Sequence, residues 1–548
     1  MASRRVKRIP LKETIAERYL DISIVLKYTI SIILSVLVLM SSENMMLFWV
    51  NILELVIIFL ISNVVIVKYN VFGNFLNAIL IFLFNIEQGI YVFGGTYLSS
   101  VMLSNIDSLA ALSGKIWVYS IGAIGIIAIS LLPIKKLEIP KRYTSIALLL
   151  LFINEISLIS GMPIENRTSP YFNFYNLYQE KLENYRIAKQ IASLPDVTKE
   201  FFKPEVADVI EKSTTINDKP NIILIFTEGL SQGIIDHKQN IMPKIKKVQQ
   251  ESINFTNYYN HTFATYRGLI GQLYSGYQFD NYDSNNLISI ESILKNEGYS
   301  TTFINSEPSN KTFTKYLNSL GFDNISTLED GRKGLSDTVS DKQMYQLLLD
   351  EAQDKFEKKK PFFISMYTFG THISMDSVDK KFGDGKNATL NKYYDLDYQF
   401  GEFFNKFVNS SVSDNTILVF TTDHGTYVDD SYQDVFESRS HGSLDQVPFF
   451  IYSKKVKPAV VDVNGRNSLN LAPTILDFID ISSPNYFLGS SLFSEAAASD
   501  FEYVFNSEND YLITKDNRIE FLKDDEKEEI VKQIEKYFAA NQQVPEGR

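Results

Sequence analysis

The stretch NIILIFTEG, residues 221–229, decides the fold of the second half of this 548-residue chain. Five apolar residues, 222–226, are followed almost at once by Glu228 and then by a glycine. A short apolar run bounded by turn residues is typical of a strand buried on both faces, as in a parallel sheet. A carboxylate just beyond such a strand lies where open α/β sheets bind ligands.

Three further stretches share this arrangement, because each places a hydroxyl, carboxylate or imidazole beside a run of strand-like residues. They are TFATYRG (262–268), YTFGTH (367–372) and TTDHG (421–425). The ends of parallel strands meet at one edge of a sheet, so we expect these stretches to form a single site. Their side chains indicate metal-dependent phosphoryl transfer.

The expected metal ligands are Glu228, Asp423, His424 and the hydroxyl of Thr265. This mainly hard set suits Mn²⁺ or Mg²⁺, and the imidazole also admits Zn²⁺. Thr265 is the expected nucleophile, because coordination would lower the pKa of its hydroxyl and align the alkoxide with a phosphorus atom. Thr262 is the competing hydroxyl.

Other polar residues are candidates for substrate binding. We expect His372 and His441 to contact phosphate oxygens or to protonate the leaving alcohol. Arg267 could clamp a phosphate, and a surface salt bridge is its alternative role. His237 and His261 are interpreted as structural.

Strand-like runs alternate with helical stretches over residues 219–523. This α/β pattern predicts a mostly parallel central sheet covered by helices. The expected strands are 222–226, 300–304, 361–367, 416–421 and 447–452. The expected helices are 242–251, 288–296, 312–320, 341–358 and 393–408. Residues 524–548 should form a C-terminal amphipathic helix and tail.

Residues 1–162 are predicted to form a transmembrane domain of five helices. Apolar runs at 20–40, 46–67, 71–93, 116–134 and 143–162 each approach the roughly 20 residues that span a bilayer. Basic residues before the first run, after the second and between the last two fall on one side of a five-span topology. Since such residues mark the cytoplasm, we expect a multi-pass cell-membrane protein with a cytoplasmic N-terminus and an extracellular catalytic domain. Residues 163–218 should form a juxtamembrane linker, helical at 175–191 and 206–212.

Three carboxylates, Glu54, Glu87 and Glu155, lie within the apolar runs. Charged groups in a membrane usually face a bundle interior or a polar cavity. They therefore indicate either a recess for a lipid head group or glycan acceptor, or ordinary interfacial and packing contacts.

Composition excludes several classes of protein. The net charge of −12 and the lack of a basic stripe argue against nucleic acid as a partner. The chain has no cysteine, which excludes disulfides, iron–sulfur clusters, thiolate zinc sites and a cysteine nucleophile.

Taken together, these stretches resemble the sulfatase-like branch of the alkaline phosphatase superfamily, and within it the lipoteichoic acid synthase type of phosphoglycerol transferase. The matching segments occur in the family's order: NIILIFTEG (221–229), TYRGL (265–269), LKNEGYSTTFIN (294–305), PFFISMYTFGTH (361–372), TTDHG (421–425), DQVPFFIY (445–452) and NLAPTILDFIDI (470–481). The resemblance implies that Glu228, Thr265, Asp423 and His424 bind the metal, with Mn²⁺ preferred, and that His372 binds substrate phosphate.

The same resemblance implies a two-step reaction. Thr265 attacks the phosphodiester of an outer-leaflet lipid, with phosphatidylglycerol the expected donor, and a cell-surface glycan or polymer then accepts phosphoglycerol. The family's synthases hold phosphate with a Trp and an Arg in a loop where this chain has Lys311 and Lys315, so the acceptor stays open. Phosphoethanolamine transfer, a catalytically inactive scaffold and simple hydrolysis are the alternatives. Sulfatase activity is not expected, because it requires a Cys or Ser that matures to an aldehyde.

Overall fold

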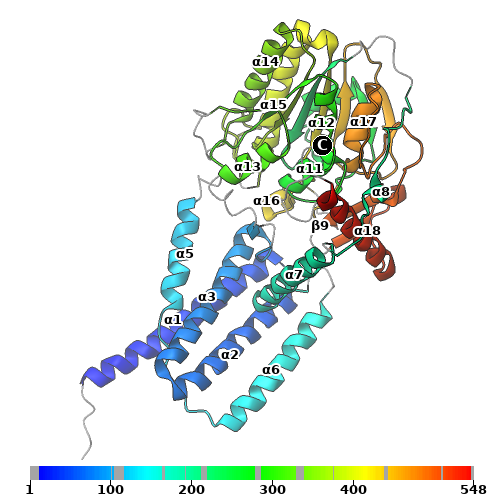
Figure 1. Cartoon of the computed structure of the whole chain (residues 1–548). Coiled ribbons are helices and arrows are strands. Elements are labelled where there is room, and N and C mark those ends of the chain that lie inside the picture. The colour runs from blue at the N-terminus through cyan, green and yellow to red at the C-terminus, as the bar shows by residue number, and fades with distance from the viewer. Residues whose placement is uncertain are drawn as a thin grey trace, which may run out of the picture. The chain divides into compact units, whose positions relative to one another are not determined.

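The computed structural model describes residues 11–42, 44–99, 102–103, 116–162, 167–191, 193–210, 219–277, 286–328, 338–373, 375–436, 442–507 and 510–544. The chain divides into two compact units (Figure 1). Among the described residues, the first unit spans 11–103 and 116–184, and the second spans 185–544.

The first unit contains all five predicted helices: α1 (Leu11–Ser42), α2 (Met45–Lys68), α3 (Asn70–Gly94), α5 (Ile116–Ser130) and α6 (Lys141–Gly161). Four apolar stretches are long enough to cross a membrane, namely Arg18–Ser42, Met45–Lys68, Asn70–Gly94 and Arg142–Gly161. Helix α5 ends before the predicted residue 134. Pro133 explains the early end, because proline disfavours helical geometry at the residue before it.

The second unit is built on an eight-stranded sheet with the order β4-β3-β5-β1-β6-β7-β2-β8. Its strands are β1 (Asn221–Thr227), β2 (Ile253–Thr256), β3 (Ser300–Ile304), β4 (Asn324–Ser326), β5 (Phe362–Tyr367), β6 (Thr416–Thr422), β7 (Phe449–Tyr452) and β8 (Ala459–Asp462). Only β7 runs antiparallel to its neighbours β6 and β2. The predicted mostly parallel sheet is therefore confirmed.

Alternate residues of β1 enter two different hydrophobic cores, because successive side chains of a strand point to opposite faces. Ile223 and Ile225 pack in a core with residues of α10 (Pro243–Gln250), α14 (Asp341–Glu357) and α15 (Ala388–Val408). Ile222, Leu224 and Phe226 belong to the opposite core. That core includes residues of α11 (Thr265–Tyr274), α12 (Ile290–Asn296), α13 (Lys311–Ser319), α17 (Leu471–Phe478) and α18 (Asp524–Gln543).

The remaining elements are short, apart from α7 (Pro170–Ile191), which contains the predicted helix 175–191. A second sheet consists of β9 (Val504–Ser507), β10 (Asp510–Ile513) and β11 (Glu520–Phe521). The short helices are α8 (Thr198–Phe201), α9 (Gln232–Ile235), α16 (Asp430–Gln433), η3 (Ser411–Asn415), η4 (Ser468–Asn470), η5 (Asp500–Tyr503) and η6 (Lys515–Asn517).

The predicted helix at 206–212 is wrong over its described part. Residues 206–209 have no helical geometry, and residues 211–212 lie outside the described range. The amide of Val209 instead donates to the Asp477 side chain of α17 at 2.9 Å. A tertiary contact therefore replaces the helical hydrogen bonds that the local sequence favours.

Candidate active site

The register of β1 and β6 brings the first candidate ligands together. The strands pair in parallel up to Thr227 and Thr422, so the residues that follow, Glu228 and Asp423, leave the sheet side by side. Each of Glu228, Asp423 and His424 offers one ligand atom, and these atoms lie within 4.8 Å of one another. All three residues are buried.

Asp423 is held through one oxygen and leaves the other unused. Its Oδ1 accepts hydrogen bonds from the backbone amides of Gly229 at 2.8 Å and His424 at 2.7 Å. Its Oδ2 is buried without a hydrogen-bond partner among the described residues. Burial, together with the charge of Glu228, raises the pKa of Asp423 to about 7. A buried, unpartnered carboxylate oxygen is costly, and a bound cation would remove that cost.

The hydrogen bonds of His424 identify the nitrogen that faces the site. Its Nδ1 lies 2.6 Å from the carbonyl oxygen of Gly425. Since a carbonyl only accepts, Nδ1 carries a hydrogen, and Nε2 is the nitrogen that can bind a metal. Nε2 lies 3.4 Å from Asp423 Oδ2 and 3.5 Å from Glu228 Oε1. This is the usual arrangement of a histidine that binds metal through one nitrogen and is oriented through the other.

Thr265 is the first residue of α11, and its Oγ1 donates to Glu228 Oε2 at 3.2 Å. The preceding residue, Ala264, has a positive φ of 82°, a strained conformation of the kind found at functional sites. Gly268 allows the close approach of α11 to the end of β6, because a Cβ there would lie 2.2 Å from the Asp423 carbonyl oxygen. The amides of the first turn of α11 also favour an anion.

The competing hydroxyl, that of Thr262, forms a hydrogen bond outside the cluster of candidate ligands. Its Oγ1 donates to the carbonyl oxygen of Asn506 in β9 at 2.7 Å. Thr265 is therefore the threonine whose hydroxyl the structure brings to the carboxylate and imidazole cluster.

His372 follows β5 and stacks on Phe369, with the ring centroids 4.4 Å apart. Its Nδ1 lies 3.1 Å from the carbonyl oxygen of Ile373, which leaves Nε2 available to a substrate. Burial lowers the pKa of His372, although the charge of Glu228 opposes the shift.

Four residues that the sequence interpretation missed surround these groups. The Tyr367 hydroxyl donates to Glu228 Oε2, and the Thr371 hydroxyl donates to the Glu228 carbonyl oxygen. Lys392 of α15 is buried and donates to the His372 carbonyl oxygen at 3.3 Å. Burial lowers the pKa of Lys392 to about 8.

Glu307, the fourth, is buried after β3 and accepts a hydrogen bond from the Asn310 side chain at 3.1 Å. Burial raises its pKa to about 8, with a further contribution from the charges of Glu228 and Asp423. The matching segment LKNEGYSTTFIN ends at residue 305 and does not include this carboxylate.

The other candidates are placed differently. Lys311 and Lys315 are exposed on α13. Arg267 lies close enough to the Tyr511 phenol for its charge to oppose the burial-driven rise in the pKa of Tyr511. His441 lies outside the described residues. Buried His261 contacts Ser468 Oγ at 2.6 Å, as expected of a structural histidine.

The donor set fits a divalent cation. Two carboxylates, one imidazole nitrogen and one hydroxyl converge, and an oxygen of Asp423 has no other partner among the described residues. Such ligands suit Mn²⁺, Mg²⁺ or Zn²⁺ and do not by themselves select one of them.

Comparisons with known proteins agree with this geometry. Residues 220–481 match the family model described as sulfatase. An N-acetylgalactosamine-6-O-sulfatase of Bacteroides thetaiotaomicron is 34% identical over 96 residues. That match covers 17% of this chain and only 18% of the relative's length.

Among solved structures, a protein in the alkaline phosphatase superfamily from Vibrio parahaemolyticus is similar with a TM-score of 0.50 and 19% identity, covering 68% of this chain and 98% of that one. The lipoteichoic acid synthase LtaP from Listeria monocytogenes has a TM-score of 0.47 and 14% identity. That match covers 60% of this chain and 91% of the synthase chain. The lipooligosaccharide phosphoethanolamine transferase A from Neisseria meningitidis has a TM-score of 0.47 and 14% identity. That match covers 86% of this chain and 95% of the transferase chain. Residues 220–481 of the second unit therefore match the sulfatase family, and the fold is similar to that of the Vibrio parahaemolyticus protein, as the sequence motifs predict.

Proposed function

We propose that this protein is a membrane-bound, metal-dependent phosphoglycerol transferase. It moves glycerol phosphate from phosphatidylglycerol to a cell-surface polysaccharide or teichoic-acid-type acceptor through a covalent threonine intermediate. The observation that carries the proposal is the contact of Thr265 Oγ1 with Glu228, 3.2 Å away, beside the unpartnered oxygen of Asp423.

Glu228, Asp423, His424 and Thr265 would hold the divalent ion, with Mn²⁺ preferred and Mg²⁺ or Zn²⁺ as alternatives. When bound, the ion lowers the pKa of the threonine hydroxyl and offsets charge on the phosphoryl group. Tyr367 and Thr371 fix the position of Glu228 through their hydrogen bonds.

The Thr265 hydroxyl releases its proton, and its Oγ forms a bond to phosphorus as the bond between phosphorus and the diacylglycerol oxygen breaks. The departing oxygen takes up a proton, so diacylglycerol leaves as the alcohol. His372 is placed to bind a phosphate oxygen or to give the leaving alkoxide a proton. In the second half-reaction an acceptor hydroxyl forms the new bond to phosphorus. That hydroxyl releases its proton as Thr265 Oγ leaves, and Thr265 takes up a proton to become the free hydroxyl again.

Thr265 itself argues against a sulfatase in spite of the fold. The aldehyde of sulfatases comes from a Cys or Ser, whose Cβ is a CH₂ group. Threonine carries a methyl group on Cβ and cannot form that aldehyde. A hydroxyl activated at a metal suits transfer of a substituted phosphate group.

The first unit supports a lipid donor and the proposed cell-membrane location. Four of its helices are long and apolar enough to cross a membrane. Lys68 ends α2, and Lys135, in the connection between α5 and α6, pairs with Asp21 of α1 at 3.2 Å. With the basic residues that flank α6, these positions favour a cytoplasmic N-terminus and a catalytic domain outside the cell.

Phosphoethanolamine transfer is a second candidate, and Glu307 favours it. Glu307 is buried, and the charges of Glu228 and Asp423 contribute to its raised pKa, so it lies near the metal ligands. A carboxylate in this position would pair well with an ammonium group. A non-catalytic scaffold is the remaining alternative, and the convergent ligand set argues against it.

Reconstitution of the full chain in liposomes with Mn²⁺ tests these possibilities. Each liposome preparation contains phosphatidylglycerol or phosphatidylethanolamine with a labelled head group, and the acceptor is a purified cell-wall polysaccharide. We expect release of diacylglycerol from phosphatidylglycerol and transfer of its label, both lost in Thr265→Ala and retained in Thr262→Ala. Labelled phosphoethanolamine on the acceptor would support the second candidate. Diacylglycerol release without transfer would indicate a hydrolase, and no release from either lipid would indicate a scaffold.

A further inference from the structure

A layer of polar side chains is buried between the helices of the first unit. Asn51 and Glu54 of α2, and Asn85 and Gln88 of α3, are each at most 2% exposed. The Asn51 amide lies 3.5 Å from Gln88 Oε1, which joins the two helices. Glu155 of α6 lies within electrostatic range of Glu54.

Five atoms of this layer have no hydrogen-bond partner among the described residues. They are Glu54 Oε2, Glu155 Oε2, Asn85 Oδ1, Asn85 Nδ2 and Gln88 Nε2. An unpartnered buried polar group is destabilising, and the hydrocarbon region of a bilayer offers no water to relieve that cost. Several such atoms in one layer therefore indicate a ligand.

A second polar layer in the same helices provides the contrast. Lys27 of α1 donates to Asn77 Oδ1 at 2.7 Å. The Asn77 amide then donates to the hydroxyl of Tyr28 at 2.9 Å and to that of Ser62 at 3.2 Å. These contacts satisfy one another and explain this layer as a link between helices.

The carboxylates of the first layer are held in position. Glu54 Oε1 accepts hydrogen bonds from the Ser169 hydroxyl at 2.6 Å and the Tyr171 amide at 3.1 Å. Glu87, which precedes Gln88 in α3, accepts from the Leu98 amide at 3.0 Å and from the Asn173 side chain at 3.2 Å. Glu54 Oε2 is therefore directed away from the partners that orient its carboxylate.

The unpartnered atoms define the chemistry of the ligand. Three of them accept hydrogen bonds and two donate, so the ligand must do both. A phosphate only accepts, and the carboxylates would repel it, whereas an ammonium only donates. Hydroxyl groups satisfy both requirements.

We propose that Glu54, Asn85, Gln88 and Glu155 bind the hydroxyls of a membrane lipid with a polyol head group. The same chemistry is found in the glycerol of phosphatidylglycerol and in the sugar of a glycolipid. The proposal rests on the proposed function in one respect only, since that function makes such a lipid a donor or an acceptor.

Native mass spectrometry of the full chain in nanodiscs tests the proposal. The probes are phosphatidylglycerol, glucosyl diacylglycerol and phosphatidylethanolamine at equal concentration. We expect the wild type to retain a polyol lipid at least about tenfold over phosphatidylethanolamine, and Asn85→Leu or Gln88→Leu to reduce that preference about tenfold. Ser62→Ala, in the satisfied layer, should leave the preference unchanged.

Each outcome has a defined meaning. Retention of phosphatidylglycerol identifies a donor site, and retention of the glucosyl lipid identifies an acceptor site. Equal retention of all three lipids, or an unchanged preference in both leucine variants with a wild-type melting temperature, overturns the proposal. Binding requires no turnover, so Thr265→Ala should bind as the wild type does. Normal binding without transfer would contradict only the proposed function.

Discussion

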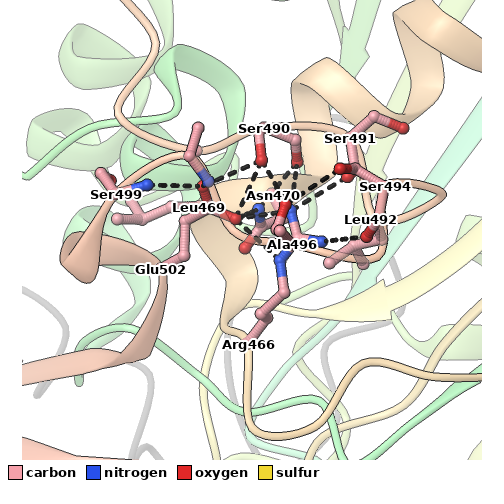
Figure 2. A network of polar contacts seen from close by, with 12 residues as sticks. Arg466, Leu469, Asn470, Ser490, Ser491, Leu492, Ser494, Ala496, Ser499 and Glu502 are labelled. Atoms are coloured by element: carbon pink, nitrogen blue, oxygen red, sulfur yellow. Dashed lines mark hydrogen bonds and ion pairs between the residues drawn. The ribbon is translucent and has the colours of Figure 1, made fainter. Parts of the chain in front are cut away.

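Two clusters of buried charge in the second unit differ in how their polar atoms are satisfied. In the first, Arg466 and Glu502 form an ion pair that serine, alanine and asparagine groups enclose (Figure 2). Glu502 Oε1 accepts from Ser490 Oγ at 2.9 Å and from the Ala498 amide at 2.7 Å, while Oε2 accepts from Arg466 Nε at 2.7 Å. In the second cluster, Asp423 Oδ2 has no hydrogen-bond partner among the described residues.

This difference distinguishes a cluster that stabilises the fold from one that can bind a metal ion and substrate. Both charged side chains of the Arg466 cluster are saturated by protein groups, so the cluster fixes the chain between η4 and β9. In the active-site cluster, the protein orients Asp423 and His424 through one atom each and leaves the other atom directed at a common point. Buried charge alone therefore does not identify a site, but converging unpartnered atoms do.

The largest expected effect is on catalysis. Thr265→Ala should reduce head-group transfer by about 10³-fold or more, because it removes the hydroxyl that attacks phosphorus. The measurement is diacylglycerol release under metal-saturated conditions. Thr262→Ala, three residues away, is the matched control and should change this rate little. Equal losses in both variants would remove the distinction between the two threonines.

Glu502→Gln should lower the free energy of unfolding by about 3–5 kcal/mol, since it leaves the Arg466 guanidinium buried without its counter-ion. Denaturant titration measures the change. The exposed pair of Glu200 and Lys536, 3.0 Å apart, is the control, and Glu200→Gln should cost no more than about 1 kcal/mol. A stable Glu502→Gln variant that has lost turnover would assign this cluster a catalytic role.

Removal of the metal should abolish turnover and also lower stability, because the site would bind the ion only in the folded chain. Linkage predicts a loss of about 2.7 kcal/mol when the free ion had been at 100 times its dissociation constant. Thermal unfolding with and without a chelator measures it. In the Asp423→Asn variant, which lacks a metal ligand, the chelator should change the unfolding temperature little. A chelator-dependent shift as large as that of the wild type would place the ion elsewhere.

The smallest expected effect concerns Glu291, a buried carboxyl that belongs to neither cluster. Burial raises its pKa from 4.5 to about 8. Between these values the folded chain holds the proton and the unfolded chain has lost it, so stability falls as the pH rises. We expect Glu291→Gln to flatten this dependence by about 1 kcal/mol between pH 6 and 7, as measured by denaturant titration. An unchanged slope would show that Glu291 is charged in the fold.

Much of the sheet could be predicted because its central strands are continuous apolar runs. Residues 222–226 and 416–421 are buried on both faces, and the predicted bounds differ from β1 and β6 by one residue at most. The short strands β2 and β8 were not predicted, since four residues carry little pattern and β8 is largely exposed. Their pairing depends on contacts between distant segments.

The candidate ligands were predictable for the same reason, because Glu228 and Asp423 each follow a recognisable strand. Tyr367 begins the stretch YTFGTH (367–372) but was given no role of its own in the site, although its hydroxyl contacts Glu228. Lys392 lies within the amphipathic helix α15, where a lysine usually faces solvent. Such residues reach the site through tertiary packing, which local sequence does not encode.

The central claim is that a divalent cation converts Thr265 into the nucleophile. Its most direct test is peptide mass spectrometry of the full chain, quenched during turnover of phosphatidylglycerol in the absence of acceptor. We predict a phosphoglycerol adduct on Thr265 that forms with Mn²⁺ and is absent after chelation. An adduct on another residue, or one on Thr265 that forms equally well after chelation, would contradict the claim.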